Sequence, residues 1–313
     1  MKRLAILLIL SASLAGAQTY TYHKYKNPSR TEVRNSSNAW VATFTNGSYT
    51  VTLSGPGRNF SEPTAGYSVT HSFWVRTSPS RFAGKTDTNW LNKALAANQA
   101  LVPDILAIAM QYIQGAAVII EGTLQVAGDA SYGPLQTDGT RQEGSDFNDY
   151  LGVAWNYSDG TLDNPEANQK YCLDCSGFMR MTFGYRHSFT GYGYADTVPL
   201  CISPKTDRSA MPRRSFEIQD WAPGTIVITN KGTQVTDFSK LNVGDLVFFD
   251  ADTGDGTQID HVGMYLGVDA GGNRRFVSSR KSIDGPTLGD YNGKSVLNGT
   301  GLYAKSFRSA RRM

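Results

Sequence analysis

The feature that most constrains the fold is a series of short strand-like segments in the last third of the chain. They are DLVFFDA from residue 245, HVGMYLGVD from residue 261 and RRFVSSR from residue 274, with GLYAKSF from residue 301 as a fourth candidate. Turn formers separate them at Gly244-Asp245 and Gly271-Gly272, so the pattern predicts strands joined by turns. A helical pattern that starts near Cys175 precedes them. One helix followed by an antiparallel sheet predicts an α+β fold.

The N-terminus has the order of a secretory leader. Lys2 and Arg3 precede an apolar run that reaches Leu10, and small residues follow up to Ala17. This predicts a signal peptide over residues 1–17, cleavage near Ala17, and a secreted, periplasmic or cell-envelope location; a retained anchor is the alternative. The run is too short to span a bilayer comfortably and no later segment is suitable, so we expect no membrane span.

The charge balance gives no reason to expect a nucleic-acid partner. The formal charge of +3 includes Lys2 and Arg3, so the chain after cleavage would carry +1 (3 minus 2). Nucleic-acid-binding domains carry a marked basic patch or excess. The terminal segment SFRSARRM is locally basic. We predict a solvated chain end there, and contact with an anionic wall polymer is the alternative.

Residues 39–77 have the pattern of antiparallel strands. Alternating β-branched and aromatic residues occur in AWVATF, SYTVTLSG and YSVTHSFWVRT, which are separated by Asn46-Gly47 and by the stretch from Gly55 to Gly66. We predict a small β-rich N-terminal unit over residues 18–85 and a larger unit over residues 86–313. Within the larger unit, a helix is predicted between Pro103 and Gly115.

The segment KYCLDCSGFMRM places Cys172 and Cys175 three positions apart, before the predicted helix. Asp174 suits the N-cap, which puts Cys175 in the first turn. There the helix dipole favours a thiolate, and free backbone N–H groups can bind a developing oxyanion. Cys175 is therefore a candidate nucleophile, although a buried cysteine can also serve as a small apolar residue.

A thiolate nucleophile needs a base, and the chain has four histidines. His23 and His71 lie in the predicted N-terminal unit, and His187 lies at the far end of the Cys175 helix. His261 begins an apolar strand, where an imidazole needs a polar partner such as a thiol. We predict His261 as the base; a hydrogen-bonded structural histidine is the alternative.

Two segments, LDCSGFMRM and LNVGDLVFFDADTGDGTQIDHVGMYLG, together resemble the signature segments of the NlpC-type bacterial cell-wall cysteine peptidases. The resemblance covers roughly residues 100–313. It implies a papain-like α+β fold, with the catalytic cysteine at the N-terminus of a helix that packs on an antiparallel sheet carrying the histidine. It also implies an enzyme that cuts peptidoglycan stem peptides, commonly next to D-glutamate, without a cofactor.

The resemblance assigns roles to three residues. Cys175 matches the nucleophile of the family and His261 matches the general base. Ser278 falls where the family has a histidine that orients the base. A serine can accept a hydrogen bond from the imidazole but carries no charge, so the orienting role is the point where this chain departs from the family pattern.

Four further residues are expected to bind substrate. Asp174 and Ser176 flank the nucleophile, and YLGVAWNYSDG is the nearest match to a family element whose tyrosine lines the site. That match places Trp155 at the tyrosine position and Tyr157 two residues later, although YIQGAAVIIEG can also be aligned there. Either aromatic side chain can instead belong to the core.

The acidic loop from Asp250 to Asp260 does not predict a metal site. Against the EF-hand template, Gly254 occupies the third ligand position and Asp255 stands where the template requires glycine. We interpret the loop as a polar turn between strands, and we predict no metal.

The three cysteines of an exported protein can form one disulfide. Pairing Cys172 with Cys201 leaves Cys175 free, so we predict that pairing; three reduced thiols are the alternative.

Together, the leader pattern and the resemblance imply an exported cysteine endopeptidase that acts on peptidoglycan stem peptides. Two alternatives remain open: a wall-binding protein that has lost turnover, and an amidase or acyl-transfer enzyme on the same fold.

Overall fold

The computed structural model describes residues 19–62, 66–186, 198–291 and 293–313. The predicted signal peptide and His187 lie outside the described residues. In chain order the strands and helices are β1 (Thr21–Tyr25), β2 (Arg30–Arg34), β3 (Trp40–Thr45), β4 (Thr50–Glu62), β5 (Tyr67–Thr77), α1 (Thr88–Gln99), α2 (Ile105–Ala109), β6 (Ile119–Glu121), β7 (Leu124–Ala127), α3 (Phe147–Leu151), β8 (Trp155–Asn156), β9 (Leu162–Asp163), α4 (Cys175–Arg180), α5 (Ser215–Trp221), β10 (Thr225–Ile228), β11 (Leu246–Phe249), β12 (His261–Val268), β13 (Arg274–Arg280), β14 (Gly285–Thr287), α6 (Leu302–Ser306) and β15 (Phe307–Arg312).

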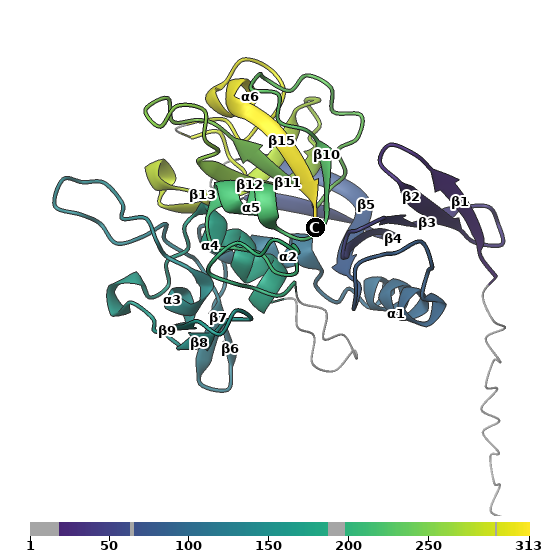
Figure 1. The fold of residues 1–313 in the computed structure, drawn as a ribbon, viewed down its shortest axis with the longest axis horizontal. Helices are drawn as coiled ribbons and strands as arrows, with labels where there is room; N and C mark the ends of the chain where they lie inside the picture. Colours follow the sequence, from purple (N-terminus) through teal and green to yellow (C-terminus); the bar gives the residue numbers. More distant parts are fainter. Residues whose placement is uncertain (1–18, 63–65, 187–197, 292) are drawn as a thin grey trace, which may run out of the picture.

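Strands β1 to β5 form an antiparallel sheet in which neighbours in sequence are neighbours in space (Figure 1). The three strands predicted between residues 39 and 77 are β3, β4 and β5. β4 continues past Gly55, because a register shift between Ser54 and Arg58 absorbs the irregular stretch. The sequence pattern does not predict β1, since all five of its residues are exposed and no apolar alternation marks it.

Helix α1 packs on this first sheet. The Asp87 side chain caps the helix by accepting from the backbone N–H groups of Asn89 and Trp90. The ring of Trp90 meets Phe44 of β3 edge-on, with 5.8 Å between ring centroids. α1 therefore shares a hydrophobic core with the N-terminal strands, although it follows the predicted boundary at residue 85.

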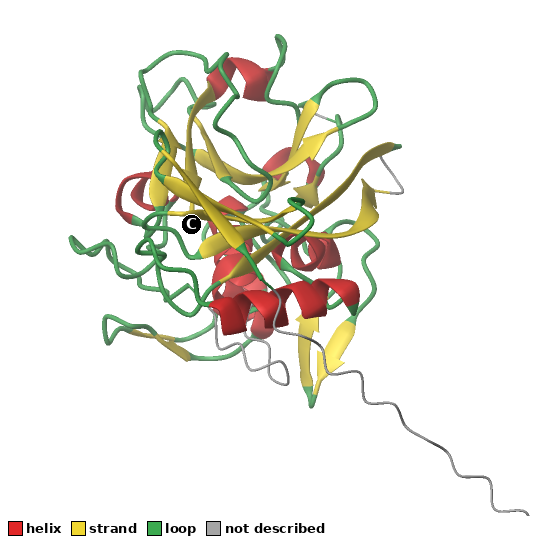
Figure 2. Ribbon diagram, turned by 90° about the vertical axis from the view of Figure 1, so that its right-hand side faces the viewer, coloured by secondary structure: helices red, strands yellow, loops and turns green. Residues whose placement is uncertain are grey.

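A second sheet has six strands in the order β10-β15-β11-β12-β13-β14, and every neighbouring pair is antiparallel. The predictions for the strands β11, β12 and β13 are confirmed. The prediction of a strand in GLYAKSF is wrong, because residues 302–306 form α6 and the strand begins at Phe307. The chain thus has a mixed α and β structure with antiparallel sheets and few helices, as Figure 2 shows.

The basic C-terminus is buried, so the prediction of a solvated chain end is wrong. Arg312 on β15 pairs with both carboxylate oxygens of Asp245 at 2.8 Å, and Arg311 donates to backbone carbonyls at and after the end of α5. These bonds satisfy the buried cations. The carbonyl oxygen of Met313 accepts from the backbone N–H of Thr50 at 2.6 Å, which ties the second sheet to the first.

Helix α4 packs against β12 and β13, on the side where Figure 1 places α2 and α3 as well. The predicted N-cap is confirmed, because an Asp174 oxygen accepts from the backbone N–H of Gly177 at 2.7 Å. The helix predicted after Pro103 is α2, which passes at Ala109 into a short 3₁₀ turn. Among the described residues we find no helix of the length and apolarity that crossing a bilayer requires.

Candidate active site

Cys175 is the first residue of α4 and is nearly buried, with 6% of its surface exposed. Its Sγ lies 3.5 Å from the Oγ of Ser215 and 4.0 Å from the carbonyl oxygen of Asp260. Burial raises the pKa of the thiol to about 12, and the negative charge of Asp174 adds to the rise. This reverses the expectation from the helix dipole, because desolvation of the thiolate outweighs the dipole of a short helix.

His261 is the first residue of β12 and pairs with Phe249 of β11. The rings of Phe249 and Tyr303 lie beside the imidazole, at centroid distances of 5.7 and 5.2 Å. Burial lowers the pKa of His261 to about 3, and the charge of Arg280 contributes to the fall. The imidazole is therefore neutral at physiological pH, and its buried Nε2 has no hydrogen-bond partner among the described residues.

The backbone brings Cys175 and His261 to the same place. Asp260, whose carbonyl oxygen faces the thiol, is the residue directly before His261, and the backbone N–H of Val262 lowers the pKa of Cys175 by hydrogen bonding. The thiol thus lies at the start of β12, where the imidazole is attached. At neutral pH both groups are uncharged, so they do not form a thiolate–imidazolium ion pair.

Ser278 lies on β13, next to the strand that carries His261. Met264 of β12 pairs with Val277, which puts Ser278 close to Gly263: a Cβ added to Gly263 would lie 3.0 Å from the Cβ of Ser278. Ser278 is fully buried, and its Oγ has no hydrogen-bond partner in the described part of the chain. The predicted orienting role of Ser278 therefore stays a prediction.

We expect Ser278→Ala to lower activity by less than about tenfold, because a neutral hydroxyl without a hydrogen-bond partner in the described part of the chain contributes little to holding the imidazole. The measurement is the rate of stem-peptide cleavage by the purified variant, compared with wild type. An inactive Ser278→Ala protein with an unchanged melting temperature would assign Ser278 an essential role and contradict this expectation.

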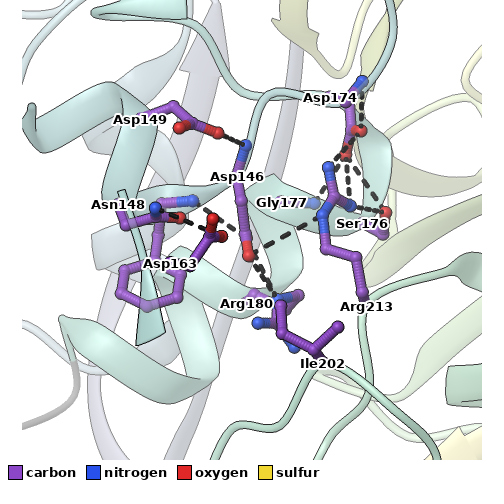
Figure 3. Close-up of polar contacts among 12 residues, drawn as sticks. Asp146, Asn148, Asp149, Asp163, Asp174, Ser176, Gly177, Arg180, Ile202 and Arg213 are labelled. Atoms are coloured by element: carbon purple, nitrogen blue, oxygen red, sulfur yellow. Dashed lines mark hydrogen bonds and ion pairs between the residues drawn. The ribbon is translucent and has the colours of Figure 1, made fainter. Parts of the chain in front are cut away.

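Asp174 and Ser176 do not lie free beside Cys175. Arg213 pairs with Asp174 at 2.6 Å through Nη2 and donates to the Ser176 Oγ at 2.6 Å through Nη1, as Figure 3 shows. Ser176 also donates to Asp174 at 3.1 Å. Both predicted substrate-binding residues are thus engaged by one guanidinium, and their contact with substrate stays a prediction.

A second buried ion pair, Asp146 with Arg180, lies beside the first (Figure 3). The Nε of Arg180 is 2.9 and 3.0 Å from the two oxygens of Asp146, and its Nη1 donates to the carbonyls of Cys201 and Met211. Burial raises the pKa of Asp146, but the charges of Arg180 and Arg213 outweigh it and hold that pKa below its ordinary value. This pair joins α3, α4 and the segment before α5.

We expect Arg180→Met to lower the free energy of unfolding by about 3–5 kcal/mol, because it leaves the Asp146 carboxylate buried without its main partner. Urea unfolding of the variant and of wild type provides the measurement. Lys281→Met is the matched control: it breaks the Lys281–Glu143 pair, whose side chains are 48% and 65% exposed, and should cost no more than about 1 kcal/mol. If the two variants lost the same free energy of unfolding, the buried pair would contribute no more to stability than the exposed pair, which would contradict the prediction.

The side chains of Trp155 and Tyr157 contact Phe147 and Asp146 at the start of α3. The Tyr157 hydroxyl donates to Asp146 at 3.0 Å, and the Trp155 ring meets Phe147 edge-on at 5.1 Å. Trp155 also lines a cavity of about 600 Å³ whose lining does not include Cys175 or His261. These contacts suit the core alternative, and the substrate-binding role of both residues stays a prediction.

Sequence reasoning missed four residues around the thiol: Tyr132, Ser215, Tyr303 and Arg213. Tyr132 is buried, and burial is the main cause that raises the pKa of its hydroxyl. The nearby Cys175 adds to this rise, and it also raises the pKa of Tyr303. Tyr132 stands in the segment GDASYGPLQTDG, whose unusual composition was its only signal. Ser215 and Arg213 belong to a stretch without periodic apolar residues, so no local signal could have found them.

The predicted disulfide is wrong, because Cys172, Cys175 and Cys201 are all free. The two predicted partners have different surroundings. The Sγ of Cys172 lies 3.8 Å from the carbonyl of Lys170, whereas the backbone of Cys201 bonds to Met211 and accepts from Arg180. Spacing along the chain could not decide whether they meet.

The loop before β12 brings three carboxylates together. Oxygens of Asp250, Asp255 and Asp260 lie within 4.8 Å of one another. Asp260 accepts from two backbone N–H groups of the loop, at 2.6 and 2.7 Å, and Asp250 pairs with Arg308 at 3.1 Å. These side-chain bonds account for the turn, whereas the backbone carbonyl of Asp260 faces Cys175.

Comparison with known proteins gives one family. Residues 161–296, a span that contains Cys175, His261 and Ser278, match the NlpC/P60 family, whose members are generally cysteine peptidases or amidases acting on peptidoglycan. A solved structure from Staphylococcus aureus subsp. aureus Mu50, described as similar to lipoprotein, NLP/P60 family, is 20% identical, with 53% of this chain and 38% of that chain covered and a TM-score of 0.26. No curated protein matches the chain. Residues 161–296 are thus similar to an NlpC/P60 domain, and this match supports the resemblance to the NlpC-type peptidases over that span.

Proposed function

We propose that this chain is an exported cysteine peptidase that cleaves peptidoglycan stem peptides, with Cys175 as nucleophile and His261 as general base. One observation carries the proposal: the thiol of the first signature segment lies 4.0 Å from the carbonyl oxygen of Asp260, directly before the histidine of the second segment. Two segments far apart in sequence thus bring a thiol close to the backbone that carries an imidazole, inside the span that matches the family, which supports the proposed pair.

The neutral state of both groups defines how the proton moves. As the Cys175 sulfur attacks the substrate carbonyl carbon, the C–S bond forms, the S–H bond breaks, and the imidazole of His261 takes the proton. The imidazolium returns this proton to the leaving nitrogen, and water then hydrolyses the thioester. Proton transfer accompanies the attack, because the pKa values of about 12 and about 3 disfavour an ion pair beforehand.

The finer parts of the proposal rest on the family. A papain-like arrangement, with the cysteine helix packed on the sheet that carries the histidine, is supported by the contacts of α4 with β12 and β13. The proposal also includes cleavage next to D-glutamate, export by the leader of residues 1–17, and a reaction without a cofactor. The five-stranded N-terminal sheet would position the enzyme on the wall or shape the substrate groove.

A second candidate is a wall-binding protein that has lost turnover. The observation that favours it is the absence of a charged or hydrogen-bonded orienting group at Ser278 among the described residues. An amidase or acyl-transfer enzyme on the same fold is the third candidate.

Incubation of purified peptidoglycan with the full chain tests all three, with mass spectrometry of the released fragments. New amino termini inside stem peptides support the peptidase. Release of intact stem peptides or transfer products supports the third candidate. Pelleting with the wall and no fragments from either wild type or Cys175→Ala would replace the peptidase with the binder.

A further inference from the structure

Ser215 is the first residue of α5 and places a hydroxyl against the Cys175 sulfur. Its Oγ lies 3.5 Å from Sγ and 3.3 Å from the carbonyl oxygen of Asp260, and the residue is buried, with 6% of its surface exposed. Three polar atoms therefore meet here: a thiol, a hydroxyl and the carbonyl directly before His261. None of these contacts is visible in the sequence, because Ser215 is 40 residues from Cys175.

A hydroxyl can both donate and accept, and it can rotate between partners. While Cys175 carries its proton, the Ser215 hydroxyl donates to the Asp260 carbonyl, and the thiol can donate to the Ser215 oxygen. Once the sulfur has lost its proton it can only accept. Rotation of the Ser215 hydroxyl then supplies a donor to the sulfur without movement of the backbone.

Neighbouring contacts fix the segment that carries Ser215. Two residues earlier, Arg213 bonds to Asp174 and Ser176, the residues on either side of Cys175 in sequence. α5 itself packs against β11 and β12. Residues 213–215 are therefore held at Cys175 from two sides, and the position of Ser215 does not depend on the Asp260 carbonyl alone.

We propose that Ser215 is a further catalytic residue, which donates a hydrogen bond to the Cys175 sulfur as the thiol gives up its proton. The inference rests on the proposed role of Cys175 as nucleophile. No bond to Ser215 breaks: the S–H proton goes to the imidazole of His261, and the Ser215 hydroxyl keeps its proton while changing its acceptor. The hydrogen bond with Ser215 is also one of the factors that lower the pKa of the buried thiol.

The test is the reactivity of the Cys175 thiol, because it needs no knowledge of the substrate. The full chain is treated with iodoacetamide over a range of pH, and the rate at Cys175 is read by peptide mapping. Since only the thiolate reacts, we expect Ser215→Ala to lower the rate at about pH 8 roughly tenfold or more. Ser309→Ala is the matched control, because it removes another buried hydroxyl, one without a hydrogen-bond partner among the described residues.

The pair Ser215→Thr and Ser215→Val repeats the test with side chains of nearly the same shape, in case Ser215→Ala folds poorly. Faster alkylation of the threonine variant than of the valine variant supports the proposal. Equal rates in wild type, Ser215→Ala and the control would overturn it, as would equal rates in the threonine and valine variants.

The outcome is separable from that of the proposed function. Slower alkylation of Cys175 in Ser215→Ala supports the hydrogen bond even if wild type releases no stem-peptide fragments. Conversely, normal cleavage by wild type with unchanged alkylation of Ser215→Ala would retain the peptidase and remove Ser215 from its mechanism.

Discussion

Cys175→Ala should abolish cleavage of peptidoglycan stem peptides, with a loss of roughly 10⁶-fold, the scale on which removal of a catalytic nucleophile acts. The reason is chemical, because no thioester can form without the sulfur. The variant should remain folded: Cys175 is a small buried side chain, and alanine fills most of its space. The measurement is the initial rate of release of new amino termini, with circular dichroism to check the fold.

Two other cysteines provide matched controls. Cys172 and Cys201 are also free and buried, and their hydrogen bonds go to residues other than Cys175. Cys172→Ala and Cys201→Ala should therefore keep near wild-type activity. Residual activity of Cys175→Ala equal to that of these controls would exclude Cys175 as the nucleophile.

The second large effect is expected from His261→Ala. Loss of the general base should lower kcat/KM by about two to four orders of magnitude, because the thiol, with a pKa of about 12, cannot ionise by itself at neutral pH. His23→Ala is the control, since His23 is an exposed residue of β1 on the other sheet. A folded His261→Ala protein with wild-type activity would remove His261 from the mechanism.

The pH dependence follows from the same residue. His261 must be neutral to accept a proton, and its pKa of about 3 lies below the ordinary value of 6.5. We therefore expect no fall of kcat/KM around pH 6.5, and a fall only as the pH approaches about 3. A resting thiolate–imidazolium pair would give a different profile, with fast alkylation of Cys175 in weak acid.

The free energy of unfolding should also depend on pH, because the folded state prefers the neutral imidazole of His261. Because the pKa of His261 is lower in the folded than in the unfolded chain, its contribution to stability is complete above about pH 6.5. That contribution is lost as the pH falls toward 3. In His261→Ala the free energy of unfolding should decline less between these two pH values than in wild type.

Two kinds of local pattern carried most of the correct predictions. Strands β11 and β12 combine apolar runs with clear turn formers, and a strand buried on both faces has such a sequence whatever surrounds it. The N-cap at Asp174 is equally local, because the capping oxygen and the N–H it accepts from are three residues apart.

The C-terminal strand could not be predicted for a physical reason. Its residues 311 and 312 are arginines, and sequence reasoning places such charges in solvent. Only the folded chain brings Asp245 and the carbonyls at the end of α5 to them. The hydrogen bonds and ion pairs formed there offset the cost of removing the two guanidinium groups from water. The strand β15 lies between β10 and β11, so a segment that reads as a polar tail holds the sheet together.

The sequence by itself determined the class of fold, the cysteine at the start of a helix and the histidine at the start of a strand, because each depends on neighbours a few residues away. Only the tertiary structure decided what surrounds the thiol. Ser215 and Arg213 reach Cys175 and its flanking residues from about 40 residues away, and the three cysteines stay unpaired. Burial also reversed the sign of the expected pKa shift of Cys175, since desolvation depends on how many distant segments cover a side chain, which no local pattern records.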